Sequence, residues 1–429
     1  MKLIAAGLFI FIGAAQAKDA VVHIGTLYAR VDVAPQRNVS LIIDDGKVRE
    51  IRKGFVALTD AKLEPSASLI DWSDDVVLPG LIDSHVHLVS DKAGVEAQLN
   101  QITLSAAAQA FDAAVNARKT LAAGFTTVRN LGDKDGVTLA LRDAIAAGKV
   151  PGPRIVDAGT SISATSGHMD GALGFRDDLR EAINDHGNLC DGADACRKAV
   201  RLQVARGVDV IKFATTGGVN SRIGLGLGAQ MFDDEARAIV ETAHLYGKRV
   251  AVHAHGADGI VMALKAGADS IEHGTLMDQA GLTLFAESGA YYVPTLSTIN
   301  GYIERLRDNP NAYPPAVKRK IEWRIGITGK ALELAHKAGV KIAFGTDAGV
   351  SLHGRNADEF ELMVKFGMSP KQALMAATVN AADLLGLSDE IGSLEPGKSA
   401  DLIALPGDPL VDLAVLKRVR AVIRAGQML

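Results

Sequence analysis

Six residues that can bind a metal ion or move a proton stand at the ends of short apolar runs of the sequence. They are His85 and His87 in LIDSHVHL, Lys212 in VDVIKFATTGG, His253 in RVAVHAHG, His273 in DSIEHGT and Asp347 in KIAFGTDAG. His85 and His87 are two positions apart, so on a strand they point to the same face. Two imidazoles on one face suit a borderline metal such as zinc, although such ligands also accept cobalt or manganese.

Each of these residues has an ordinary interpretation when taken alone. A histidine at a strand end is commonly a hydrogen-bonded structural residue, and Asp347 would serve equally as the N-cap of a following helix. The shared position of all six, after an apolar run, is what predicts a metal centre.

Lys212 carries the most information among the six residues. Burial of an ammonium ion is costly and lowers its pKa, so a lysine inside VDVIKFA is expected to be neutral part of the time. A neutral amine can take up carbon dioxide as a carbamate, giving N6-carboxylysine. The set then offers four imidazoles and two anionic oxygen donors, enough for two divalent ions that share a hydroxide. The alternative is a lysine that extends to the rim of the site.

The elements that must position these residues follow a repeated pattern. From about residue 100 onward, an Ala-rich amphipathic stretch is followed by a Gly, a short apolar run and a polar residue. The Gly suits the left-handed end of a helix, and it stands at six places: Gly124, Gly207, Gly247, Gly267, Gly289 and Gly339. Helices that alternate with buried strands predict an α/β fold with a parallel sheet. The apolar runs at 76–88 and 153–159 bring the expected strands to eight, the number that closes a (β/α)8 TIM barrel.

The two ends of the chain differ from this middle part. Residues 18–78 and 388–429 read as short strands and turns, and Asp45-Gly46 is a strong signal for a two-residue hairpin. Neither end has enough apolar residues for a core of its own. We therefore expect both ends to form one small β-sandwich domain beside a barrel built from residues 79–387, whose strand ends hold the six polar residues.

Composition excludes several other classes of protein. The 429 residues include 46 Lys plus Arg against 50 Asp plus Glu, a formal charge of −4, so no cationic surplus is present for nucleic acid or an anionic membrane. Residues 1–17 read as a signal peptide cleaved near Ala17, with an apolar run too short for a stable membrane anchor. A secreted or periplasmic location is expected. There Cys190 and Cys196 can form a disulfide, although two free thiols fit the sequence almost as well.

The motifs LPGLIDSHVHL, VIKFATTGGV, VAVHAHG, IEHGT, FGTDAG and GSLEPGKSADLIAL resemble those of the metal-dependent amidohydrolase superfamily. The resemblance is to the imidazolonepropionase-like branch, which contains Xaa-Pro dipeptidases, related carboxypeptidases and ochratoxin-degrading amidohydrolases. It implies that one metal ion is held by His85, His87 and Asp347 and a second by His253 and His273, with carboxylated Lys212 between the two ions. It also implies a homo-oligomer.

The implied reaction is attack of a metal-bridging hydroxide on the amide of a dipeptide or an N-acyl amino acid, ochratoxin-like amides included, which releases the C-terminal amino acid. Asp347 is the expected general acid and base. Three positions after His253 stands Gly256, where ring-deaminating relatives usually carry Glu, which argues against a deaminase or an imidazolonepropionase.

Further candidates for substrate contacts lie in the neighbouring loops. His168 and Arg222 are expected to recognise a substrate carboxylate, with a surface arginine as the alternative for Arg222. His255 is expected to touch the substrate or support a ligand, unless it is a histidine of the solvent-exposed rim. His353 is a further candidate pocket residue.

Two other functions remain compatible with these residues. A site with a carboxylated lysine also serves cyclic amides of the hydantoin or dihydroorotate type. A periplasmic metal-binding protein without catalysis is the third possibility, against which Asp347 argues, because a pure binding site needs no proton carrier.

Overall fold

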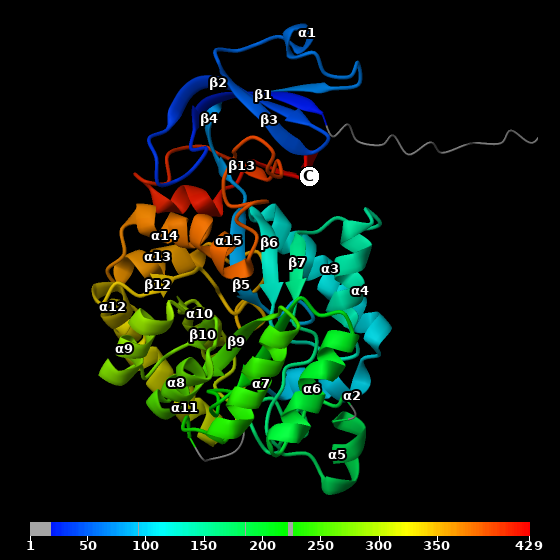
Figure 1. Ribbon diagram of the computed structural model, residues 1–429, viewed down its shortest axis with the longest axis vertical. Helices are drawn as coiled ribbons and strands as arrows, with labels where there is room; N and C mark the ends of the chain where they lie inside the picture. The colour runs from blue at the N-terminus through cyan, green and yellow to red at the C-terminus, as the bar shows by residue number, and fades with distance from the viewer. Residues whose placement is uncertain (1–18, 93, 185, 222–225) are drawn as a thin grey trace, which may run out of the picture.

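The computed structural model describes residues 19–92, 94–184, 186–221 and 226–429. The expected signal peptide over 1–17 and Arg222 lie outside the described residues. The chain forms an α/β fold in which helices surround parallel strands, and a separate sheet lies at one end of the molecule (Figure 1).

The sheet at the end of the molecule draws its strands from both ends of the chain (Figure 1). Its order is β15-β14-β13-β4-β1-β2-β3. The strands are β1 (Ala20–Leu27), β2 (Gln36–Asp44), β3 (Lys47–Lys53), β4 (Ser68–Pro79), β13 (Leu402–Leu405), β14 (Ala421–Arg424) and β15 (Gln427–Met428). Because β13 pairs antiparallel with β4, the two ends join in one sheet of seven strands. Whether this sheet makes the two layers of a sandwich remains a prediction.

The hairpin expected at Asp45-Gly46 is confirmed. Asp44 pairs with Lys47 across the turn between β2 and β3. Asp45 and Gly46 have φ of 46° and 74°, the two positive values that a tight hairpin turn of this kind requires.

Eight strands form the middle of the chain, in the order in which they were expected. They are β5 (Leu81–Val86), β6 (Phe125–Asn130), β7 (Arg154–Asp157), β8 (Val210–Ala214), β9 (Arg249–Ala254), β10 (Ser270–His273), β11 (Tyr291–Val293) and β12 (Lys341–Ile342). All pairs among them are parallel, in a sheet of order β5-β6-β7 and a sheet of order β12-β11-β10-β9-β8. Single parallel bridges, Ile162 to Phe213 and Val86 to Ala348, lie between the two sheets.

Helices follow or precede these strands and cover them on the outside (Figure 1). They are α2 (Gly94–Thr103), α3 (Ala106–Ala122), α4 (Val137–Ala146), α5 (Asp177–Ile183), α6 (Ala193–Ala205), α7 (Asp233–Leu245), α8 (Ala257–Ala266), α9 (Gln279–Ser288), α10 (Thr298–Asp308), α11 (Pro315–Ile327), α12 (Lys330–Lys337), α13 (Asp358–Lys365), α14 (Pro370–Ala376) and α15 (Val379–Leu385). Outside this set, α1 (Leu58–Ala61) contacts β1 of the seven-stranded sheet, and the 3-10 turn η1 (Leu413–Lys417) lies beside α13. The six glycines expected at helix ends all have positive φ, between 66° and 96°. In the described part of the chain, none of the helices has the length and apolar character needed to cross a bilayer.

The strands that carry the candidate site are buried on both faces. Every residue of β5, β6 and β8 is buried, as is all of β9 except its first residue. Such runs are typical of parallel strands covered by helices on the outside. Lys212 therefore lies in the middle of a wholly buried strand, as its apolar neighbours in the sequence indicate.

Cys190 and Cys196 are joined by a disulfide, which decides between the two alternatives left open by the sequence. Cys196 lies in α6, and Cys190 lies in the segment that leads into this helix. The backbone N–H of Cys190 donates to the carbonyl of Ser163, so the disulfide also secures the loop that follows β7.

Candidate metal centre and active site

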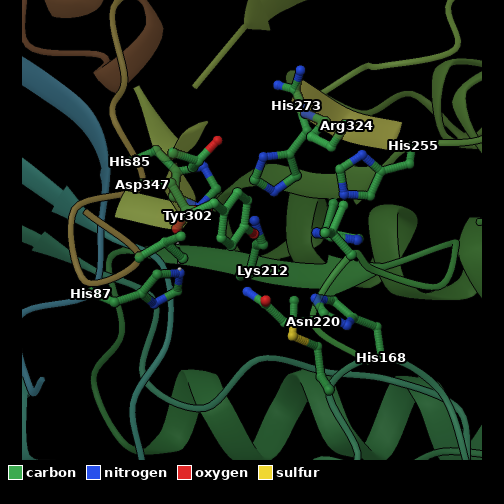
Figure 2. A pocket seen from close by; sticks show the side chains of 15 residues that line it. His85, His87, His168, Lys212, Asn220, His255, His273, Tyr302, Arg324 and Asp347 are labelled. Atoms are coloured by element: carbon green, nitrogen blue, oxygen red, sulfur yellow. Dashed lines mark ion pairs between the residues drawn. The ribbon is translucent and has the colours of Figure 1, made fainter. Parts of the chain in front are cut away.

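One cavity of about 170 Å³ collects all six residues that the sequence placed at strand ends. His85, Lys212, His253 and His273 come from β5, β8, β9 and β10, and the other two, His87 and Asp347, follow β5 and β12. Figure 2 shows His85, His87 and Asp347 on one side of the cavity, His255 and His273 on the other, and Lys212 between them. The carboxyl ends of these strands thus meet at one site.

The first group consists of His85, His87 and Asp347. His85 Nδ1 lies 2.8 Å from Glu272 Oε2, and His87 Nδ1 lies 3.2 Å from the carbonyl oxygen of Gly132. An ionised carboxylate and a carbonyl can only accept hydrogen bonds, so both rings carry their proton on Nδ1.

The Nε2 atoms of both rings then present lone pairs to the same carboxylate. His85 Nε2 lies 3.6 Å and His87 Nε2 3.3 Å from Asp347 Oδ1. Three electron-pair donors that face one another repel unless a cation lies among them. Imidazole and carboxylate are ligands suited to zinc and related divalent ions, so this group fits a metal ion.

The second group consists of His253, His255 and His273, whose candidate ligand atoms lie within 4.8 Å of one another. The hydroxyl of Thr295 donates to the carbonyl of Pro294 and so accepts from His273 Nδ1 at 2.7 Å, which leaves His273 Nε2 facing the cavity. Burial holds the pKa of all three rings well below the usual value, so they are neutral at physiological pH and retain lone pairs for a cation.

Lys212 lies between the two groups with an amine that has no hydrogen-bond partner among the described residues. Its side chain is only 1% exposed. Burial lowers its pKa to about 8, although the charges of Glu272 and Asp347 act in the opposite direction. An amine without a hydrogen-bond partner, and neutral part of the time, is able to react. Beside two groups of electron-pair donors, a modified lysine could supply a further ligand.

Glu272 and Arg129 form a buried network behind His85. Arg129 Nη2 donates to Glu272 Oε1 at 2.8 Å, and the Ser270 hydroxyl donates to the same oxygen at 2.5 Å. Burial acts to raise the pKa of Glu272, but the charge of Arg129 and the hydrogen bond from His85 lower it to about 2. Glu272 is therefore ionised, and it fixes the orientation of His85.

Two of the expected ligands have strained backbones. His273 has φ of 69° and Asp347 has φ of 57°. Non-glycine residues in this left-handed region cost about 1–3 kcal/mol each and are concentrated at functional sites. The hydrogen bond from the Asp347 N–H to the His85 carbonyl, 2.7 Å long, helps to hold this conformation.

Of the four candidate substrate residues, His168 and His255 line the metal cavity. His168 lines the cavity and stacks on His253 with ring centroids 4.0 Å apart. His255 also lines it and is 4% exposed, so it is not a histidine of the solvent-exposed rim. Arg222 lies outside the described residues.

His353 requires a correction, because the structure places it behind the site rather than in the cavity. Its Nε2 donates to the carbonyl oxygen of His87 at 3.0 Å, and its Nδ1 accepts from the Thr120 hydroxyl at 3.3 Å. Both ring nitrogens are thus occupied by protein groups. His353 supports the backbone of His87 instead of facing a substrate.

Among the polar residues of the cavity that sequence reasoning missed are Arg324 of α11 and Tyr302 of α10. Arg324 is 4% exposed, and its guanidinium donates to the Thr328 hydroxyl at 3.1 Å. Among the described residues no carboxylate lies within ion-pair distance of it. Both residues lie within helices rather than after apolar strands, so the pattern that identified the six ligands gives no signal for them.

The geometry agrees with what comparison with known proteins finds. The model of the amidohydrolase family matches residues 76–429. The chain belongs to the amidohydrolase family. It is a hydrolase that acts on amide bonds, and the resemblance found in its motifs is confirmed.

Comparison with individual proteins shows which members of the amidohydrolase family this chain is similar to. The chain is 32% identical to ochratoxinase of Aspergillus niger over 427 residues, which cover 95% of this chain and 85% of that protein. A solved Xaa-Pro dipeptidase with bound methionine in its active site is 40% identical, with a TM-score of 0.88 over 96% of this chain and 99% of the other. Imidazolonepropionase of Symbiobacterium thermophilum is 27% identical over 85% of this chain and 83% of that protein.

Proposed function

We propose that this amidohydrolase is a binuclear metal-dependent enzyme that cleaves the amide bond of dipeptides or N-acyl amino acids and releases the C-terminal amino acid. The observation that carries the proposal is the convergence of His85 Nε2, His87 Nε2 and Asp347 Oδ1 on one point, as three donors without a proton among them. The similarity to a dipeptidase and an ochratoxinase supports the choice of substrate.

The residues present fit two divalent ions, with zinc as the expected metal. His85, His87 and Asp347 would hold one ion, and His253 and His273 the other. When bound, the ions polarise the amide carbonyl and lower the pKa of water towards neutrality. His255, which joins the second group of histidines, is in reach of the same ion or of the substrate.

Carboxylated Lys212 would supply a further oxygen ligand for the ions in this proposal. The neutral Nζ of Lys212 attacks carbon dioxide, a C–N bond forms as one C=O π pair moves to oxygen, and the amine releases one proton to water, which gives N6-carboxylysine. The orphaned position of Nζ and its pKa of about 8 favour this reaction, since the free amine is needed for it. The anionic product would be balanced by the cations beside it.

Asp347 moves the proton in the hydrolytic step. Burial acts to raise its pKa, but contacts with His85 and His87 lower it, so the carboxylate is ionised and able to accept a proton. It takes the proton of the attacking water and delivers it to the amide nitrogen as the C–N bond breaks. The hydroxyl oxygen of that water remains on the acyl product.

Arg324 takes the role of carboxylate binder that the sequence suggested for His168 and Arg222. A buried guanidinium without a carboxylate partner favours an anionic ligand, and its planar fork matches a carboxylate bidentately. Tyr302 and His168 line the same cavity and are placed to contact the amino acid as well. The substrate would thus present its C-terminal carboxylate to α11.

Three further features belong to the proposal. The parallel bridges between the two sheets of the middle segment are consistent with a closed (β/α)8 barrel, and the seven-stranded sheet with a sandwich-like second domain. The disulfide supports an oxidising location outside the cytoplasm. A homo-oligomer is expected, as the family resemblance implies.

The test is turnover by the zinc-loaded protein of Ala-Pro, N-acetyl-phenylalanine and a hydantoin. The proposal requires metal-dependent hydrolysis of at least one of the first two. Asp347→Asn is expected to lower kcat at least about 100-fold. Activity on the hydantoin alone would instead establish a cyclic-amide hydrolase, and metal binding without turnover of any of the three compounds would reject the proposed substrates.

A further inference from the structure

A second cavity of about 230 Å³ adjoins the metal cavity and shares two residues with it, His87 and Met169. It lies beyond the carboxyl ends of β6 and β7, under the loop that follows β7. Its wall is partly apolar, with Val89 and Met169, and partly polar, with Lys134 and the amides of Asn184 and Asn188. Asp133 also lines it, and burial raises the pKa of this carboxyl, which favours the neutral form.

The position of this cavity relative to Arg324 suggests what it holds. Arg324 lines the metal cavity but not the second one, whereas His87 lines both. If the amino acid that leaves lies against Arg324 and the scissile carbonyl lies at the metal ligands, the other half of the substrate must extend past His87. The metal cavity alone is smaller than the roughly 300 Å³ at which typical ligand pockets begin, whereas both cavities together fall within that range.

Lys134 gives the second cavity a chemical preference. Burial lowers its pKa, an effect that the charges of Asp135 and Asp170 oppose. No carboxylate of a described residue lies within 4.0 Å of its amine. Gly171 leaves space for this amine, because a Cβ at that position would lie 2.4 Å from Lys134 Nζ.

The two carboxylates whose charges act on Lys134, Asp170 and Asp135, have other partners. Asp170 accepts from Arg180 at 2.9 Å and from Asn184 at 2.8 Å. Asp135 lies 3.6 Å from His186 Nδ1. A half-buried ammonium group is thus left without an anion within ion-pair distance among the described residues, beside a cavity that shares His87 with the metal cavity.

We propose that the cavity beside His87 binds the acyl half of the substrate and that Lys134 selects acyl groups ending in a carboxylate. This inference rests on the proposed function, because it assumes that the amide bond to be cleaved lies at the metal ligands. The preferred substrates are then N-acyl amino acids or dipeptides with an anion at each end. Arg324 binds one anion, Lys134 binds the other, and the amide bond lies between them.

The test compares two substrates that differ in one charge, N-succinyl-phenylalanine and N-pentanoyl-phenylalanine, with the zinc-loaded enzyme. Wild type is expected to prefer the succinyl compound. Lys134→Met is expected to lower kcat/KM for it about 10- to 100-fold, mainly through KM, since a charge-assisted hydrogen bond is lost. The pentanoyl compound is expected to change less than about threefold. Lys149→Met, at an exposed lysine after α4, is the matched control.

Other outcomes overturn the inference. An equal loss on both substrates would mean that Lys134 only supports the structure, and no loss on either would mean that the cavity does not bind the acyl group. Lys134→Arg, which keeps the charge, should retain the preference for the succinyl compound. If wild type hydrolyses neither of these compounds and neither Ala-Pro nor N-acetyl-phenylalanine, the proposed function fails. Calorimetric binding of N-succinyl-phenylalanine to wild type and Lys134→Met then decides whether the subsite exists.

Discussion

The carboxylate of Glu272 accepts a hydrogen bond from His85 Nδ1 at 2.8 Å, across 187 positions of sequence, with both side chains almost completely buried. Glu272 precedes His273 in β10, and His85 lies in β5. The contact ties the two groups of candidate ligands together. One residue of β10 lines the metal cavity, and its neighbour orients a ligand from the opposite group.

Replacement of the Glu272 carboxylate tests whether this residue orients His85 for metal binding. Glu272→Gln removes the charge that holds the proton on His85 Nδ1, so zinc affinity is expected to fall about 10- to 100-fold. The measurement is competitive metal titration of the purified apoprotein. Because Arg129 also loses its buried counter-ion, a loss of about 3–5 kcal/mol of folding free energy is expected in parallel.

Glu241→Gln, at an exposed position of α7, is the control for both measurements. Circular dichroism identifies the temperature range in which Glu272→Gln remains folded. Wild-type zinc affinity within that range would contradict the orienting role of Glu272.

Substitution of Arg324 tests recognition of the substrate carboxylate. Arg324→Met is expected to raise KM for N-acetyl-phenylalanine about 10- to 100-fold, because an ion-paired hydrogen bond is lost. The corresponding phenylalaninamide derivative lacks the carboxylate, so its turnover should change little. Steady-state kinetics with both compounds provides the measurement.

Arg319→Met, at an exposed position of the same helix, should behave as wild type does. A similar loss for the acid and the amide would assign Arg324 to the structure of α11 rather than to the substrate.

The buried pair Asp133 and Asp157 predicts how stability depends on pH. Burial, with the charge of Asp157 added, raises the pKa of Asp133 to about 7, and burial raises that of Asp157 to about 6. The unfolded chain loses these protons near pH 4, so between pH 4 and pH 7 the folded state binds more protons than the unfolded state. This contribution to stability is complete below about pH 4 and is lost as the pH rises through 7.

Asp157→Asn should remove the part of that loss that comes from ionisation of Asp157 and from its charge beside Asp133. One oxygen of each carboxylate, Asp133 Oδ1 and Asp157 Oδ2, has no hydrogen-bond partner among the described residues. Asparagine cannot ionise, so the variant is expected to be more stable than wild type by at least about 1 kcal/mol at pH 8 and about equal to it at pH 4.5. Urea unfolding at both pH values measures the difference. An equal difference in stability between the variant and wild type at both pH values would show that Asp157 does not lose its proton in this pH range.

The disulfide predicts a redox dependence of stability. It closes a short segment, since Cys190 and Cys196 are six positions apart. The double variant Cys190→Ser with Cys196→Ser is expected to lose about 2 kcal/mol of unfolding free energy. Urea unfolding of wild type with a reducing agent should reproduce this loss, whereas the double variant should be insensitive to the agent. Equal stability of oxidised and reduced wild type would show that the bond is dispensable.

The residues that follow a repeated local signal could be predicted from the sequence. A glycine with positive φ, a buried strand and a polar residue recur in six of the eight units, so the order of β5 to β12 and the convergence of six polar residues could be expected. The hairpin at Asp45-Gly46 has a local cause of the same kind.

Residues whose importance arises from packing could not be found in this way. Arg129 and Glu272 lie inside strands as isolated charges, and only the fold shows that they meet 2.8 Å apart. Arg324 reaches the cavity from a helix, and His353 turns away from it to the backbone of His87. In each case the decisive contact joins segments that are distant in the sequence, and no local pattern encodes it.

Because β4 pairs with β13, the seven-stranded sheet can be completed only late in the synthesis of the chain. β4 ends at Pro79 and finds its neighbour only at Leu402–Leu405, so one edge of β4 stays open until almost all of the polypeptide has been synthesised. An open edge with free N–H and C=O groups invites contact with other chains. A nascent chain, or one truncated before residue 402, would therefore expose this edge of β4 to pairing with other chains.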